Sequence, residues 1–136
     1  MALVIDTSAL IQMERSGGGA AGLRQETGNS AAFVPVIVWA ELLAGVHLAD
    51  TVERALARRS RIERLRRSVG TLEFTEAVAE TWARLFAHLQ RQGTPIPSND
   101  LQVAAIAAFH RYTILVGPAD EAHFRRIPDL DIRVWK

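Results

Sequence analysis

The sequence LVIDTSAL, residues 3–10, places a carboxylate and two hydroxyl groups directly after an apolar run. Residues 3–5 have the composition of a short strand that is buried on both faces, as strands of parallel sheets are. An acid at the end of such a strand is expected to cap a helix, to pair with a cationic group or to hold a metal ion. The simplest of these readings is capping, with Thr7 or Ser8 as the cap and Asp6 assisting.

Two further acids stand alone in segments that are otherwise apolar. Glu41 is the one acid of PVIVWAELLAGVHLA, residues 35–49, which predicts a largely buried helix. Burying an unpaired carboxylate costs several kcal/mol, so Glu41 must reach solvent, meet an arginine or bind a cation. Asp100 begins the alanine-rich helix of SNDLQVAAIAAFHRY, where the partial positive charge of the helix N-terminus also suits an ordinary first-turn acid.

Asp120, which follows the aliphatic run 113–116, adds a fourth carboxylate, and the four together predict a metal site. Strand ends and helix starts can share one rim of an α/β sheet, where crowded acids repel one another and raise their pKa values. A divalent cation relieves that repulsion, and ligation by oxygen alone favours Mg²⁺ or Mn²⁺. Ions held in this way characteristically act on phosphates. The scattered histidines are predicted to be surface or packing residues: His47, His88, His110 and His123.

Alternation of strands and helices along the chain predicts the scaffold for these acids. Apolar runs predict strands over residues 2–6, 31–34, 70–74, 113–116 and 131–134. Helices are predicted to about residue 15 and over 35–48, 51–68, 75–92 and 98–111. Residues 16–30 are predicted to be a loop with one helical turn at most. The pattern indicates an α/β fold, a compact sandwich with a mainly parallel central sheet and helices on both faces.

Local signals set several of these boundaries. Pro35 is predicted at the first helical position, Thr75 as a helix cap, and Ser98 or Asn99 as another cap. The helix over 51–68 is expected to carry an apolar stripe of four residues, Val52, Leu56, Ile62 and Leu65.

Length and composition narrow the class of protein. A chain of 136 residues with 49% hydrophobic residues predicts a single domain over 1–136 with a substantial core. The absence of cysteine excludes disulfides and thiolate metal ligation. The apolar start is interrupted by Asp6, and the most apolar stretch, 33–49, is shorter than the ~20 residues of a membrane span. We therefore expect a soluble cytoplasmic protein that does not contact membranes.

Seven arginines fall within residues 54–67, and this cluster has two possible interpretations. As structure it is a solvated helix face, with Glu63 and Arg67 as an i,i+4 pair. As function, Arg54, Arg58 and Arg61 could follow an RNA backbone. The solvated face is the preferred interpretation.

Four blocks in order, VIDTSAL, VWAELLAG, PIPSNDLQVAAIA and ILVGPADEAHFRRIPDLDIRVW, resemble PIN-domain proteins, and more narrowly the VapC toxins of bacterial toxin–antitoxin pairs. The resemblance covers nearly the whole chain. It implies an α/β/α sandwich and a Mg²⁺- or Mn²⁺-dependent endoribonuclease whose RNA hydrolysis inhibits translation or growth. It also implies a VapB-type antitoxin as partner, and a homodimer that forms a heterotetramer or larger assembly with it.

The resemblance also implies which residues act. Asp6, Glu41 and Asp100 match the first three family acids, as metal ligands and catalytic residues. In the fourth block Gly117-Pro118-Ala119 replaces the usual start, and counting back from His123 places Asp120, rather than Glu121, at the acid position.

Two other function classes compete with the nuclease. The first is a catalytically inactive module that binds RNA or a protein partner, against which the intact set of acids argues. The second is a phosphatase of small phosphoesters, which would place a second Asp two residues after the first, where this chain has Ser8.

Overall fold

A computed structural model describes residues 2–17 and 19–135, and its centre is a five-stranded sheet in the order β3-β2-β1-β4-β5. Every neighbouring pair in the sheet is parallel. The strands are β1 Ala2–Ile5, β2 Ala31–Pro35, β3 Gly70–Leu72, β4 Thr113–Val116 and β5 Ile132–Val134. All four residues of β4 are buried, as expected for a central strand of a parallel sheet covered on both faces. The predicted α/β sandwich with a parallel sheet is therefore confirmed.

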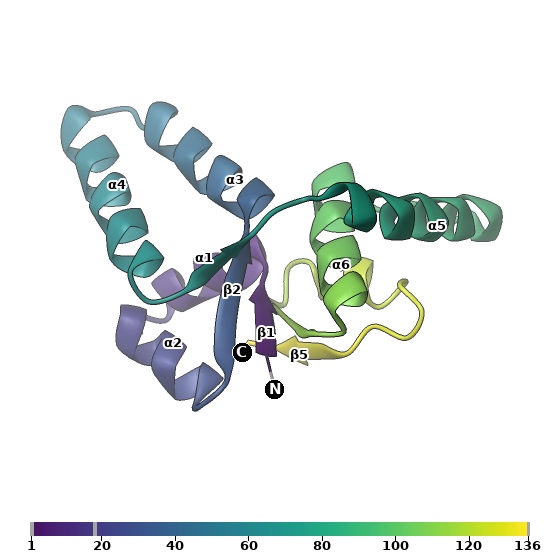
Figure 1. Cartoon of the computed structure of the whole chain (residues 1–136). Helices are drawn as coiled ribbons and strands as arrows, with labels where there is room; N and C mark the ends of the chain where they lie inside the picture. The colour runs from purple at the N-terminus through teal and green to yellow at the C-terminus, as the bar shows by residue number, and fades with distance from the viewer. Residues whose placement is uncertain (1, 18, 136) are drawn as a thin grey trace.

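Helices connect the strands and cover the sheet. They are α1 Thr7–Arg15, α2 Gly19–Thr27, α3 Val36–His47, α4 Val52–Arg66, α5 Glu76–Gln92, α6 Ser98–His110 and α7 Glu121–Phe124. Crossovers between parallel strands are right-handed, so the reversal of direction after β3 places α5 to α7 on the face opposite α1 to α4. Figure 1 shows the hairpin of α3 and α4 on one side of the sheet and the packed pair α5 and α6 on the other.

The strand order creates a switch point between β1 and β4. From β1 the chain proceeds toward β2 and β3, whereas from β4 it proceeds the opposite way to β5. In open α/β sheets ligands bind at the carboxyl ends of the strands beside such a point. Asp6 follows β1 and Asp120 lies four residues beyond β4, so the topology itself brings two of the predicted site residues to this rim.

Three predicted boundaries were wrong for local reasons. The region expected to be a loop contains α2, because Leu23 is buried and packing against the rest of the chain outweighs the glycines of this helix. Pro35 ends β2 with an extended ψ of 148°, and Pro97, with a ψ of 144°, replaces Ser98 or Asn99 as the residue before α6. Thr75 does cap α5, its hydroxyl accepting a hydrogen bond from the Val78 backbone N–H.

The helical hairpin of α3 and α4 is less buried than its sequence predicted. Ile62 and Leu65 lie in the core, but Val52 and Leu56, expected in the same stripe, are 72% and 63% exposed. On α3 only Val38, Trp39 and Val46 are buried, although the helix was predicted to be largely buried. Apolar composition predicted α3 and helical spacing predicted α4, but the described residues leave part of the hairpin's apolar surface exposed.

Among the residues that the structure describes, no helix combines the length and the apolar character that a membrane crossing requires.

Candidate active site

Asp6 is fixed at the junction of β1 and α1. It is the N-cap of α1, and its Oδ2 accepts hydrogen bonds from the Ser8 backbone N–H at 3.0 Å and from the Ser8 hydroxyl at 2.5 Å. The helix cap is therefore Asp6 itself, although Thr7 or Ser8 was predicted to be the cap with Asp6 assisting. Only 1% of Asp6 is exposed, and this burial raises its pKa to about 6 although the Ser8 bonds act in the opposite direction.

Ser8 also ties the end of β1 to the segment that follows β4. Its hydroxyl accepts a hydrogen bond from the Gly117 backbone N–H at 2.9 Å, and the Asp6 N–H donates to the Leu115 carbonyl at the same distance. A Cβ at position 117 would lie 2.3 Å from the Ser8 carbonyl oxygen. This close approach explains why a glycine stands where the sequence departs from the family pattern, and it fixes the loop that carries Asp120.

Glu41 reaches the same rim from the second turn of α3. The Thr7 hydroxyl donates a hydrogen bond to Glu41 Oε1 at 2.8 Å. In the described part of the chain no arginine forms an ion pair with Glu41, which is half-buried. An arginine partner for Glu41 is therefore ruled out within the described residues, which leaves contact with solvent or with a cation.

Asp100 lies in the first turn of α6 and meets the loop after β4. Burial raises the pKa of Asp100, and the hydrogen bond with His123 opposes that rise. His123 Nδ1 lies 2.7 Å from Asp100 Oδ2 and 3.9 Å from Asp120 Oδ1. Glu121, the other candidate for the fourth acid, instead pairs with Arg125 at 3.1 Å. The loop after β4 thus turns the carboxylate of Asp120, not that of Glu121, toward Asp100.

Three of the four predicted acids line one cleft of about 550 Å³ at the switch point, and Asp6 is buried close to it. Glu41, Asp100 and Asp120 line it together with α1 residues, and the charges of Asp100 and Asp120 both contribute to the raised pKa of Asp6. All four predicted acids therefore come together. The donor set is almost entirely carboxylate and hydroxyl oxygen, the chemistry that a hard divalent cation requires. We conclude that the residues present fit such an ion.

His123 was predicted to be a surface or packing residue, but the structure places it beside Asp100 and Asp120. Asp100, Asp120 and His123 each offer one ligand atom, and these atoms lie within 4.8 Å of one another. The sequence signal that could have indicated His123 was its spacing of three residues from Asp120, which puts both on one side of a helical turn. The turn is α7, whose four residues are too few to produce a periodic pattern. Arg15, at the end of α1, also lines the cleft.

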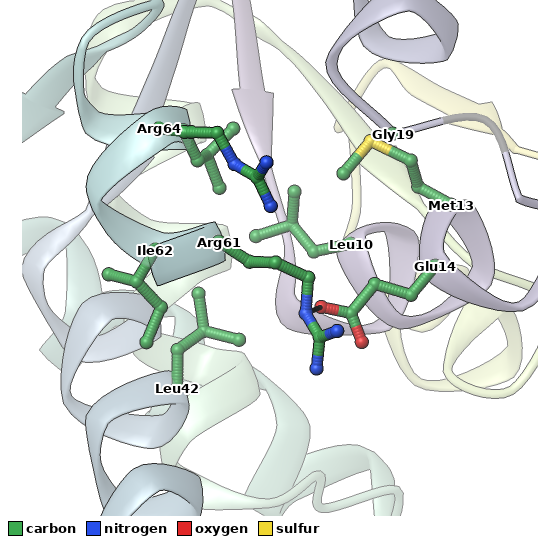
Figure 2. A pocket seen from close by; sticks show the side chains of 9 residues that line it. Leu10, Met13, Glu14, Gly19, Leu42, Arg61, Ile62 and Arg64 are labelled. Atoms are coloured by element: carbon green, nitrogen blue, oxygen red, sulfur yellow. Dashed lines mark ion pairs between the residues drawn. The ribbon is translucent and has the colours of Figure 1, made fainter. Parts of the chain in front are cut away.

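A second cavity lies on the other side of α1 and has a different character (Figure 2). It measures about 260 Å³ and is lined mainly by apolar side chains of α1, α3 and α4, including Leu10, Met13, Leu42, Ile62 and Leu65. Figure 2 shows Arg61 of α4 reaching across to Glu14 of α1, with Nε of Arg61 3.5 Å from Oε1 of Glu14. We call this cavity the apolar groove, and the cleft around the four acids the acid cleft.

The arginines of α4 are engaged mostly with the protein itself. Arg54 pairs with Asp50 at 2.7 Å, and Arg58 donates to the Gly45 carbonyl. The predicted pair of Glu63 and Arg67 does not form; Glu63 lies 3.7 Å from Arg66 instead, and Arg67 binds the Glu63 carbonyl. These contacts support the interpretation of this helix as a solvated face.

Comparison with known proteins assigns this chain to a protein family. A family profile described as PIN domain matches residues 3–130, which is almost the whole chain. A curated relative, Ribonuclease VapC1 of Rickettsia felis, is 30% identical over 132 residues, covering 97% of this chain and 95% of the relative. The chain therefore belongs to the PIN-domain family, and within it to the VapC ribonucleases.

Solved structures agree with this assignment. VapBC-5 from Mycobacterium tuberculosis, described as a member of the VapBC family of toxin-antitoxin systems, has a TM-score of 0.75 and 26% identity and covers 100% of this chain and 99% of its own. VapBC2 from Rickettsia felis, solved bound to a DNA fragment from its promoter, has a TM-score of 0.85 over 100% of both chains. At 22% identity, the second likeness establishes the fold alone. The resemblance drawn from the four sequence blocks is thus confirmed.

Proposed function

We propose that this protein, acting as one domain over residues 1–136, is a metal-dependent endoribonuclease and the toxin of a VapBC-type toxin–antitoxin pair. Hydrolysis of phosphodiester bonds in cytoplasmic RNA would inhibit translation or growth. The observation that carries the proposal is the convergence of four acids: Glu41, Asp100 and Asp120 line one cleft, and the charges of Asp100 and Asp120 act on the buried Asp6. Within the described residues, no arginine forms an ion pair with any of the four. The similarity to ribonucleases of the VapC family supports the same conclusion.

Each side chain has a role in this proposal. Asp6, Asp100 and Asp120 would hold one or two Mg²⁺ or Mn²⁺ ions. The ion would supply charge neutralisation for phosphoryl oxygens and a lowered pKa for water. Glu41, oriented by the Thr7 hydroxyl, would complete the metal site or accept a proton from the attacking water. Arg15 at the edge of the cleft would attract the phosphate chain.

Ser8 contributes by position. Its hydroxyl donates to Asp6 and accepts from Gly117 N–H, so it holds the acid of β1 and the loop of Asp120 in fixed relation. Precise placement of ligands is what a catalytic metal site needs. A small-molecule phosphatase with an Asp nucleophile would require an acid at this position, and Ser8 is already committed to a structural task.

The partner that we propose is a VapB-type antitoxin. It would place a segment across the acid cleft and exclude RNA, and two toxin chains would pair in a heterotetramer or larger assembly. The structural neighbours are complexes of the VapBC kind, which supports this part of the proposal.

The deciding experiment is incubation of the purified protein with total RNA. Cleavage that requires added Mg²⁺ or Mn²⁺ and stops in EDTA is the expected result, and mapping of the cut ends would identify the target. RNA binding without cleavage under any metal condition would favour the alternative, an inactive binding module.

A further inference from the structure

Within the described residues, His123 is the one histidine that pairs with acids of the acid cleft. Its Nδ1 lies 2.7 Å from Asp100 Oδ2 and 3.9 Å from Asp120 Oδ1, so it is near both carboxylates. A histidine that only orients a ligand contacts that one ligand from its outer side. The proximity of His123 Nδ1 to two candidate ligands indicates that it is itself a ligand.

The separations of His123 Nδ1 from the two carboxylate oxygens are close to those between ligands of one metal ion. Adjacent ligands of an octahedral ion at 2.0–2.1 Å are separated by about 3 Å, and opposite ligands by about 4 Å. The separations of Nδ1 from the two oxygens fall close to this range, and all three atoms lie within 4.8 Å of one another. A rotation of the Asp120 or His123 side chain that shortens the longer of these separations would let the three bind one ion together.

Two different elements hold this arrangement. Asp120 and His123 are three residues apart around the short helix α7, and Phe124, next to His123, is completely buried and fixes that turn. Asp100 comes from the first turn of α6. The side chain of Asp120 makes no capping hydrogen bond to α7, so its carboxylate is available within the cleft.

We propose that His123 is a ligand of the cleft's metal ion, alongside Asp100 and Asp120, and that it makes the site prefer Mn²⁺ over Mg²⁺. Mg²⁺ takes oxygen ligands, whereas first-row transition ions also bind imidazole nitrogen. One nitrogen in an otherwise oxygen set therefore favours the transition ion. This inference rests on the proposed function only in assuming that the acid cleft binds a divalent ion.

The test uses the full-length protein and free Mn²⁺, and it reads the ligand directly. Pulsed electron paramagnetic resonance of the Mn²⁺ complex should show coupling to an imidazole ¹⁴N nucleus. His123→Gln should remove that coupling, whereas His47→Gln, at the exposed C-terminal end of α3, should leave it intact. A Mn²⁺ complex without the ¹⁴N coupling, or a coupling that survives His123→Gln, would overturn the proposal.

Affinities give a second readout. His123→Gln should weaken Mn²⁺ binding about 10-fold or more while changing Mg²⁺ binding much less. His123→Asp, which makes all the ligand atoms oxygen, should lower the ratio of Mn²⁺ to Mg²⁺ affinity toward one. Equal losses for both ions in His123→Gln would contradict ligation and indicate a general role in shaping the cleft.

The two proposals fail in different ways. If His123 is not a ligand but the nuclease assignment is right, the wild-type protein still cleaves RNA with Mg²⁺ and the ¹⁴N signal is missing. If the nuclease assignment is wrong, RNA stays intact with either metal while Mn²⁺ binding and its ¹⁴N coupling are still measured. Absence of Mn²⁺ binding altogether overturns the inference about His123.

Discussion

The acid cleft and the apolar groove are built on opposite faces of the same helix. Along α1, the cleft is lined by Thr7, Ser8, Ile11, Gln12 and Arg15, and the groove by Leu10, Met13 and Glu14. The helical period of 3.6 residues separates these two sets onto two faces. One short helix thus lines the acid cleft with one face and the apolar groove with the other.

The difference between the two regions is one of energetics. The groove places apolar side chains against one another, which stabilises the fold by about 25 cal/mol for each Å² removed from water. The cleft collects carboxylates that repel one another, with Asp6 almost fully buried and its pKa raised to about 6. Such a region costs stability in the free protein, and binding of the proposed cation would offset that cost. Variants in each region should therefore differ in what they change.

The largest expected effect is on activity and comes from the cleft. Asp100→Asn keeps the size of the side chain and removes the charge of a proposed ligand, so RNA cleavage should fall by at least about 10³-fold, equivalent to about 4 kcal/mol. The measurement is cleavage of a mapped RNA substrate under single-turnover conditions, with circular dichroism as the control for folding. Cleavage that persists in the variant, and in EDTA, would refute the assignment of this site.

The matching variant in the groove should affect stability instead. Ile62 is 5% exposed in the wall of the groove, and truncation of a buried isoleucine to alanine typically costs about 2–5 kcal/mol. Ile62→Ala should lower the free energy of unfolding by an amount in this range, measured by urea denaturation. Cleavage per folded molecule should stay within about twofold of wild type. A selective loss of activity in a stably folded variant would contradict the separation of the two regions.

Asp6→Asn should show the cost of the cleft directly, as a gain in stability. The pKa of Asp6 is raised from 3.8 to about 6 on folding, so the folded protein binds more protons than the unfolded chain between these values. Its free energy of unfolding therefore falls as pH rises from about 4 to about 6, and the lower value persists above that range. Without metal, Asp6→Asn should be up to about 3 kcal/mol more stable than wild type near pH 7 and equal to it near pH 4.

The measurement is urea denaturation of both proteins in EDTA across this pH range. Added Mn²⁺ should stabilise the wild type more than the variant, because the variant lacks a ligand charge. A constant difference between the two proteins at every pH would show that the charge of Asp6 carries no such cost.

The sequence predicted more about the acid cleft than about the apolar groove. The sequence predicted that Asp6, Glu41, Asp100 and Asp120 come together, because strand ends and helix starts can share one rim of an α/β sheet. The first three drew notice as acids in apolar settings, whereas Asp120 follows an aliphatic strand and matches the family pattern. The convergence of acids from four segments was therefore foreseeable. His123 was not, since its proximity to Asp100 depends on the exact path of the loop after β4, which Gly117 and Ser8 fix through one close contact.

The sequence was less informative about the groove and its surroundings. Helical periodicity placed Ile62 and Leu65 on one side of α4, and the structure confirms their burial. The same pattern assigned Val52 and Leu56 to that side, yet the end of the hairpin extends beyond the sheet and leaves them exposed. Periodicity predicts which residues share a helix face but not how far the neighbouring layer reaches. The length of an apolar stripe and the length of the surface that covers it are independent quantities.

The smallest expected effect comes from the ion pair at the edge of the groove. Arg61 and Glu14 lie 3.5 Å apart with about half of each side chain exposed, so solvent screens their attraction. In a double-mutant cycle of Arg61→Gln and Glu14→Gln, the coupling should stay below about 1 kcal/mol and decrease further in 1 M NaCl. RNA cleavage should be unchanged in all three variants if the α4 arginines form a solvated face. A steeper salt dependence of RNA binding in wild type than in Arg61→Gln would instead assign this arginine to the RNA path, and would join the two faces of α1 in one function.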